Sequence, residues 1–195
     1  MTGRIQVRLA TPRDADVIAW HRARMFQDMD QLPPDLFEPL RSSARDRLTV
    51  ALETGEYVGW LASAKESPDT IVAGVGVQLR QAFPHPRRRA DGSVVVAGGR
   101  HAIVLNVFTE PPWRRQGLAE LLMRHVLAWA RNEMLDRLVL HASVEGRPLY
   151  ERLGFVPSNE MRLADPVSSE PAEGAGPPGA SASGYASART NPRDA

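Results

Sequence analysis

The sequence predicts one α/β domain built on a mixed, mostly antiparallel β-sheet that is flanked by helices. Short runs in which apolar and polar residues alternate, such as Ile5–Leu9, are typical of strands. Longer segments carry apolar residues at helical spacing, most clearly from Gln116 to Asn132. The succession of strand, helix and strand between Ala102 and His141 indicates a right-handed crossover that joins two parallel strands.

Two helices are predicted to follow the first strand. Thr11 suits the N-cap of a helix and Pro12 suits its first position, so a helix should run from there to about Asp28. A second helix is expected over Asp35–Glu53, with an interruption near Pro39 because proline lacks a backbone N–H group.

The middle of the chain is predicted to contain an antiparallel hairpin. Its strands should be Tyr57–Ala64 and Thr70–Leu79, joined by a turn that contains Ser67–Asp69. The segment 81–100 has no clear pattern apart from a short extended piece at Val94–Val96.

The second half of the domain alternates strands and helices. Ala102–Phe108 is strongly apolar and should be a central strand that is buried on both faces. After the helix at Gln116–Asn132, a strand is expected at Leu138–His141 and a short helix at Gly146–Leu153. A last strand is predicted from Phe155 onward.

The composition changes near residue 165, which divides the chain into a domain at 1–164 and a tail at 165–195. The tail consists mostly of Pro, Gly, Ser and Ala and offers almost nothing large and apolar to bury. We therefore expect it to be disordered. The alternative is a partner-binding peptide that folds on contact.

The overall composition excludes several classes of protein. The 195 residues include no cysteine, which rules out disulfides and thiolate metal sites, and no H-E-x-x-H pattern predicts a metal. The net charge of +1 argues against a nucleic-acid binder. Without an apolar run long enough for a membrane helix or a signal peptide, a cytoplasmic location is expected. Lys65 is the only lysine among many arginines, a bias that points to a high-GC bacterium.

The segment that carries chemistry is the turn between the apolar strand and the next helix. Arg114, Arg115 and Gly117 occupy this turn, and the small residue Ala119 follows. The first amides of a helix lack partners in the chain and can bind a phosphate. The turn therefore predicts an anion-binding site. The alternative is that Gly117 merely makes a tight turn and that the arginines are solvated.

Two motifs resemble those of the GNAT superfamily of acyl-CoA N-acetyltransferases. Arg114-x-x-Gly117-x-Ala119 resembles the R/Q-x-x-G-x-G/A signature, and Gly146–Phe155 is similar to the family's Tyr-x-x-x-Gly-Phe element. The order of elements also matches. The resemblance implies a GNAT-like fold, in which the parallel strand pair is central and splays apart.

The resemblance also implies that acetyl-CoA is the cosubstrate. Backbone amides of the signature turn would bind its pyrophosphate, and the end of the preceding strand would bind its pantetheine arm and the acetyl carbonyl. Ser143 falls where other members often have Asn or Ser near the cofactor. The residues implied to bind acetyl-CoA are Val107, Phe108, Thr109, Arg114, Arg115, Gln116, Gly117, Leu118, Ala119, Glu120 and Ser143.

Tyr150 is the candidate general acid that the resemblance suggests. An amine would attack the thioester directly, and a phenol with a pKa of about 10 can protonate the leaving thiolate. The alternative is a core tyrosine whose hydroxyl is already bonded. For the base, several family members have a glutamate where this chain has Ile103, which cannot act. His101 lies on the same face of the strand by parity and is the candidate base; the alternative is a solvated histidine at a strand start.

The sequence therefore predicts an N-acetyltransferase that acts on a primary amine of a small molecule or peptide. The alternative is a non-catalytic acetyl-CoA-binding regulatory or sensor module, which the missing strand carboxylate would favour. A nucleic-acid binder that uses the arginine-rich segment 87–89 is a third possibility, against which the net charge weighs. The resemblance makes a homodimer plausible.

Overall fold

The computed structural model describes residues 4–89 and 91–161. The chain divides into two units, 1–155 and 156–195. The fold and the candidate site below belong to the first unit. The predicted tail at 165–195 lies outside the described residues, so the boundary at 164 stays a prediction.

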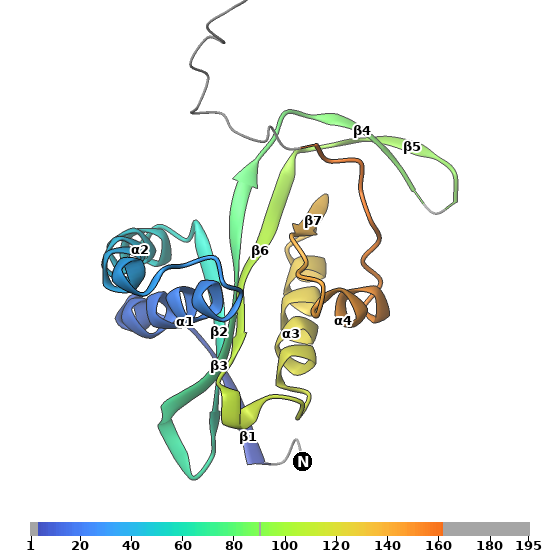
Figure 1. Cartoon of the computed structure of the whole chain (residues 1–195). Coiled ribbons are helices and arrows are strands. Elements are labelled where there is room, and N and C mark those ends of the chain that lie inside the picture. The colour runs from blue at the N-terminus through green and yellow to red at the C-terminus, as the bar shows by residue number, and fades with distance from the viewer. Residues whose placement is uncertain (1–3, 90, 162–195) are drawn as a thin grey trace, which may run out of the picture. The chain divides into compact units, whose positions relative to one another are not determined.

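A five-stranded sheet forms the centre of the first unit (Figure 1). The strand order is β1-β2-β3-β6-β7. All neighbours are antiparallel except β6 and β7, which are parallel, so the predicted mixed sheet is confirmed. The bounds of its strands are Ile5–Leu9 (β1), Tyr57–Ala64 (β2), Ser67–Gln81 (β3), Arg100–Thr109 (β6) and Arg137–Leu140 (β7).

Helices cover both faces of this sheet. The helices α1 and α2 lie on one face, and α3 and α4 lie on the other (Figure 1). Short 3-10 turns lead into α1 and α2 at Pro12–Asp14 and Pro34–Leu36. The helix bounds are Ala15–Asp28 (α1), Phe37–Glu53 (α2), Leu118–Asn132 (α3) and Arg147–Arg152 (α4).

The entry to α1 is fixed by a carboxylate. Asp14 accepts hydrogen bonds from the backbone N–H and the hydroxyl of Thr11, at 2.8 and 2.9 Å, and from both terminal nitrogens of Arg8. The bonds from Arg8, followed by those from Thr11, lower the pKa of Asp14 to about 2. The predicted start of this helix is therefore confirmed, although Asp14 rather than the Thr11 side chain is the main acceptor.

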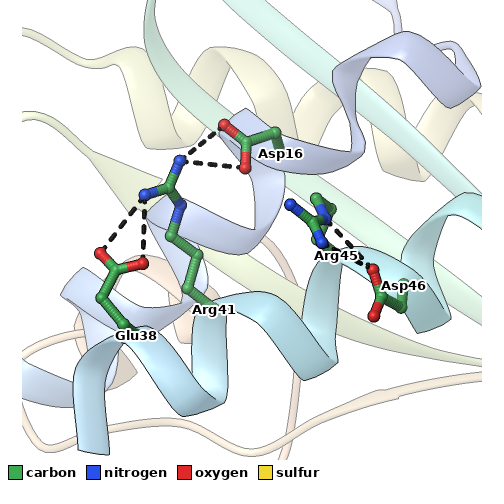
Figure 2. Close-up of polar contacts among 5 residues, drawn as sticks. All are labelled: Asp16, Glu38, Arg41, Arg45 and Asp46. Atoms are coloured by element: carbon green, nitrogen blue, oxygen red, sulfur yellow. Dashed lines mark hydrogen bonds and ion pairs between the residues drawn. The ribbon is translucent and has the colours of Figure 1, made fainter.

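Arg41 links α1 to α2 (Figure 2). Its guanidinium donates to both oxygens of Asp16 in α1, at 2.8 and 3.0 Å, and to Glu38 in α2 at 3.3 and 3.4 Å. By contrast, Arg45 bonds only to its neighbour Asp46 among the described residues. Exposed ion pairs stabilise little individually, but a shared arginine restricts how the two helices slide.

Two hydrophobic clusters fill the space on either side of the sheet. One cluster joins the sheet to α3, with Leu122, Met123 and Val126 fully buried. The other joins the sheet to α1 and α2 and includes Tyr57, which is 5% exposed. Gly76 of β3 makes room for this ring, because a Cβ atom there would overlap the Tyr57 hydroxyl.

Three local predictions were wrong, and one segment proved more regular than its sequence indicated. Pro39 does not interrupt α2, because it lies in the first turn, where no backbone N–H is needed. The hairpin turns at residues 65–66 rather than at 67–69, which belong to β3. The segment 81–100, which showed no clear pattern, contains a second hairpin formed by β4 (His85–Arg88) and β5 (Val94–Ala97), and the extended piece expected at Val94–Val96 is confirmed by β5. No strand is assigned between Phe155 and the last described residue, Met161.

Candidate active site

A β-bulge interrupts β6 near its end. Leu105 pairs with Gly76 and Phe108 pairs with Gly74, so two residues of β6 lie opposite one residue of β3. The first of the two, Asn106, has φ of +55°, in the left-handed region that few residues other than glycine adopt. The bulge therefore changes the direction in which the side chains of β6 point.

Two partners, the half-buried Arg22 and the buried Tyr57, hold Asn106 in this conformation. Its Oδ1 accepts a hydrogen bond from Arg22 Nη1 at 2.7 Å, and its Nδ2 donates to the Tyr57 hydroxyl at 3.0 Å. Burial raises the pKa of Tyr57 to about 12 and lowers the pKa of Arg22. Leu105 and Asn106 both face α1 and α2, whereas Val107 packs against the cluster on the α3 side.

The parallel pair of strands separates just before this bulge. Pairing of β6 with β7 runs from His101 opposite Arg137 to Val104 opposite Leu140, where β7 ends. β6 continues to Thr109 with no strand partner on that side among the described residues (Figure 1). The splayed pair expected from the resemblance is therefore present, and it leaves backbone N–H and C=O groups free to bond an extended ligand.

The signature turn between β6 and α3 presents a run of free amides. Arg115 and Gly117 have φ of +62° and +82°. Left-handed residues in such a turn aim successive N–H groups into one concavity, a nest that binds anions. In the part of the chain that the structure describes, the amides from Arg115 to Glu120 donate to no backbone carbonyl, and the first helical bond runs from Leu121 N–H to Gly117 C=O. A Cβ atom at Gly117 would meet no other atom within 4 Å, so the glycine is favoured here by its left-handed φ rather than by crowding.

The exposed residue Arg114 braces this turn through contacts with β6 and α1. Its Nε donates to the Thr109 carbonyl at 2.9 Å, and its guanidinium also bonds Asp28 of α1 and lies 5.5 Å from the ring centroid of Phe108. It therefore ties the turn to the end of β6. The exposed side chain of Arg115 makes no ion pair with any described residue, so it is the one available to an anionic ligand.

Tyr150 lies within α4, and Ser143 lies in the turn that precedes this helix. The half-buried Tyr150 ring packs edge-on against Phe155, and its hydroxyl bonds to no described residue. Burial raises the pKa of Tyr150, which keeps the phenol protonated near neutral pH. Ser143 Oγ accepts from the Gly146 N–H at 3.1 Å and so caps the turn. Gly146 packs closely here, since a Cβ would lie 3.1 Å from the Tyr150 ring and the ring would have to shift slightly.

The structure does not bring His101 to this region. It lies near the start of β6, about 20 Å from Val107 at about 3.3 Å per strand residue. Its ring contacts His85 at 5.1 Å, and burial, Arg137 and His85 lower its pKa. The assignment of His101 as the base stays a prediction, which this separation from Val107 disfavours, because strand parity places residues on a face but says nothing of distance along it. Ile103 is 3% exposed and supplies no base either.

Sequence analysis made no prediction for another histidine, His21, which lies near the end of β6. His21 of α1 is 2% exposed, its ring lies 4.9 Å from Phe108, and its Nε2 lies 3.5 Å from a carboxylate oxygen of Glu110. Burial lowers the pKa of His21 to about 4, so it is neutral at physiological pH. A lone histidine in a helix gives no sign of this position in the sequence.

A cavity of about 170 Å³ lies on the α1 and α2 side of β6. Residues from five elements line it, and Arg22, Tyr57 and Asn106 are among them. The polar group formed by Arg22, Tyr57 and Asn106 was also not predicted from the sequence. Its one sequence signal is that Asn106 interrupts an apolar strand.

Comparison with known protein families identifies the family of this chain. The family model described as "Acetyltransferase (GNAT) family" matches residues 15–155. The chain belongs to this family. The GNAT resemblance of the sequence is thereby confirmed, and membership indicates an acetyltransferase of a family that uses acetyl-CoA.

Solved structures share the GNAT fold of this chain. A GCN5-related N-acetyltransferase from Ralstonia eutropha is 26% identical, with a TM-score of 0.69 over 82% of this chain and 97% of that one. A predicted acetyltransferase from Clostridium acetobutylicum, solved with acetyl-CoA, is 22% identical, with a TM-score of 0.65 over 83% and 96%. Glucosamine-6-phosphate N-acetyltransferase from Arabidopsis thaliana is 13% identical, with a TM-score of 0.57 over 83% and 97%. No curated protein matches the sequence.

The described residues also bear on membrane spans and metal sites. No helix in the described ranges is long and apolar enough to cross a membrane. No cluster of His, Asp and Glu that could hold a metal occurs in the same ranges. The expected homodimer, cytoplasmic location and bacterial source stay predictions.

Proposed function

We propose that this GNAT protein transfers an acetyl group from acetyl-CoA to a primary amine of a small molecule or peptide by direct attack. The observation that carries the proposal is the run of free amides at Arg115–Glu120, which follows, after a 3-10 turn at Pro111–Trp113, the end of β6 that has no partner on the β7 side. A pyrophosphate and an extended amide-bearing arm need these two features side by side.

The residues present fit acetyl-CoA. The nest supplies several N–H donors to phosphate oxygens, and the positive end of the α3 dipole adds to the attraction. Backbone groups of Val107–Thr109 have the pattern of a strand edge and can bond the pantetheine amides as a further strand would. Bound acetyl-CoA supplies a thioester, whose carbonyl is the electrophile.

Groups of the chain itself then stabilise the developing charge and donate a proton. A backbone N–H at Val107 or Phe108 stabilises the negative charge that develops on the acetyl oxygen. The N–C bond forms as the C–S bond breaks, and Tyr150 donates its hydroxyl proton to the leaving sulfur. The phenol is suited to this role because it is protonated and bonds to no other described group.

The amine must lose a proton before or during attack, since an alkylammonium has a pKa of about 10.4. Glu110 is the carboxylate that directly follows β6, and its neighbour His21 is neutral. We therefore move the proposed base from His101 to Glu110, which acts directly or through water.

The test is a thiol-release assay with acetyl-CoA and a broad panel of amines, run beside calorimetric titration of acetyl-CoA. We expect binding and release with at least one class of amine. Binding without release from any amine would favour the sensor alternative, for which the replacement of the strand carboxylate by Ile103 is the supporting observation. Failure to bind acetyl-CoA would overturn both functions.

A further inference from the structure

The cavity beside the bulge of β6 combines a compact size with an unusual charge pattern. Three of its lining residues carry charge, namely Arg22, Arg47 and Glu56. Arg47 and Glu56 bond each other, and Gln78 donates a further bond to Glu56 at 2.7 Å. Their charges cancel locally, so the lining keeps one positive charge, that of Arg22.

Arg22 has no carboxylate partner within 4.0 Å in the described part of the chain. Its one hydrogen bond goes to the neutral Asn106 side chain, and its Cζ lies 4.9 Å above the ring of Phe26. Arg22 is half-buried on α1, and burial lowers its pKa. A guanidinium that is removed from water and lacks a counter-ion is costly, and a bound anion would offset that cost.

We propose that this cavity binds a carboxylate of the acceptor, so that the amine acetylated by the protein is a small amino acid or a similar amine bearing a carboxylate, held by Arg22. The proposal rests on the acetyltransferase function proposed above and names its substrate class. A planar guanidinium with free N–H donors matches the two oxygens of a carboxylate.

Size and charge favour a carboxylate over a phosphate. The cavity volume of about 170 Å³ is well below the 300–1,000 Å³ typical of drug-sized ligands, which indicates a compact ligand. A phosphate carries about −1.5 to −2 charges at neutral pH, more than the single positive charge that the lining leaves unbalanced.

The cavity also lies where an acceptor is needed. Its lining includes Leu105 and Asn106, and the next residue, Val107, faces the side of the sheet that carries the nest and Tyr150. An acceptor held by Arg22 on one side of β6 would therefore project its amine toward the end of the strand where the thioester is proposed to lie.

The experiment compares matched pairs of acceptors that differ only in charge. Glycine with glycinamide, β-alanine with β-alaninamide, and larger amino acids with their amides are assayed for thiol release from acetyl-CoA. The same pairs are titrated calorimetrically into the protein preloaded with CoA, which reports binding without turnover.

Three variants sharpen the comparison. Arg22→Gln removes the charge, and Arg22→Lys keeps the charge but not the planar fork. Arg45→Gln removes a positive charge from α2 outside the cavity lining, where Arg45 bonds only Asp46 among the residues that the structure describes (Figure 2). Thermal unfolding of each variant checks that it folds.

We expect the ratio of kcat/KM for carboxylate over carboxamide to fall about tenfold or more in Arg22→Gln, less in Arg22→Lys, and not at all in Arg45→Gln. Comparing this ratio between variants cancels the difference in reactivity between the two amines. General damage to the fold would lower kcat/KM for both members of a pair alike. Calorimetric binding of the carboxylates should weaken in Arg22→Gln in the same way.

Two results would overturn the proposal while leaving the acetyltransferase function intact: acetylation of carboxamides or plain alkylamines in preference to carboxylates, or a ratio that Arg22→Gln leaves unchanged. If acetyl-CoA binds but no amine is acetylated, the proposed transferase function fails. Calorimetric binding of the carboxylates then tests the carboxylate site by itself. Arg22-dependent binding of the carboxylates would then support the cavity as a carboxylate site, and its absence would dismiss it.

Discussion

The two sides of β6 are built from different chemistry. On the side of α3 and α4, the candidate acetyl-CoA site consists of backbone amides and left-handed turn residues that are close in sequence. On the side of α1 and α2, the cavity depends on side chains brought together from afar. Asn106 bonds Arg22 and Tyr57, which lie 84 and 49 positions away.

The two kinds of site differ in what a change of sequence does to them. A site made of backbone groups depends on conformation, which a short motif can specify. A site made of side chains changes with single substitutions on separate elements. The first can be recognised from a signature, and the second must be read from the folded chain.

The largest effect is expected on the acetyl-CoA side, at Tyr150. We expect Tyr150→Phe to lower kcat by about 100-fold, a typical contribution of general acid catalysis, because the phenylalanine cannot protonate the leaving sulfur. The acetyl-CoA affinity measured by calorimetry should stay the same, since the ring and its packing on Phe155 are kept. An unchanged kcat would show that the hydroxyl plays no part in the reaction.

A pH effect is expected next, from His21 on the α1 side. The unfolded chain protonates this residue near pH 6.5, whereas the folded protein keeps it neutral down to about pH 4. The unfolded state binds more protons in this window, so the unfolding free energy should fall by about 2 kcal/mol as pH drops from 6.5 to 4. Glu110, 3.5 Å away, moderates the loss when it is charged.

Denaturant unfolding at several pH values measures this effect. The control is His21→Gln, which removes the titrating group and should flatten the profile between pH 6.5 and 4. A variant profile as steep as that of the natural chain would assign the pH dependence to other residues.

The extent to which the sequence predicted the structure follows the same division. The alternation of Ile5–Leu9, the apolar face of α3 and the crossover to β7 are local patterns, and the structure has these elements where they were expected. The turn between β6 and α3 was likewise predicted, because Gly117 and two arginines lie between an apolar strand and a helical pattern. The splay of β6 from β7 followed from the resemblance and is present.

The differences from the structure arose where the decisive contact is distant. His101 was chosen by strand parity, which says nothing of where along the strand a residue lies. The cavity was missed because no local pattern places Arg22 beside Asn106. Pro39 was read as a breaker because its position within the first helical turn depends on where the turn at Pro34–Leu36 ends.

A stability effect of similar size is expected at the bulge. Asn106→Ala removes both hydrogen bonds, leaves the Arg22 and Tyr57 groups without this partner, and keeps an unfavourable φ of +55°. We expect a loss of about 2 kcal/mol in unfolding free energy. Asn106→Gly relieves the backbone conformation but not the lost bonds, so it should recover part of the loss. If both variants were as stable as the natural chain, the polar group would not hold the bulge.

The smallest effect tests the nest itself. Gly117→Val places a β-branched residue at φ of +82°, where the side chain has space but the backbone is strained. The strain should shift the turn and weaken acetyl-CoA binding about tenfold, the equivalent of about 1.4 kcal/mol. Gly55→Val is the matched control, because Gly55 has φ of +73° and open space but follows α2. Both variants should lose similar stability, so only a loss of affinity confined to Gly117→Val attributes binding to the geometry of this turn. Equal affinities in the two variants would mean that acetyl-CoA does not depend on the free amides after Arg114.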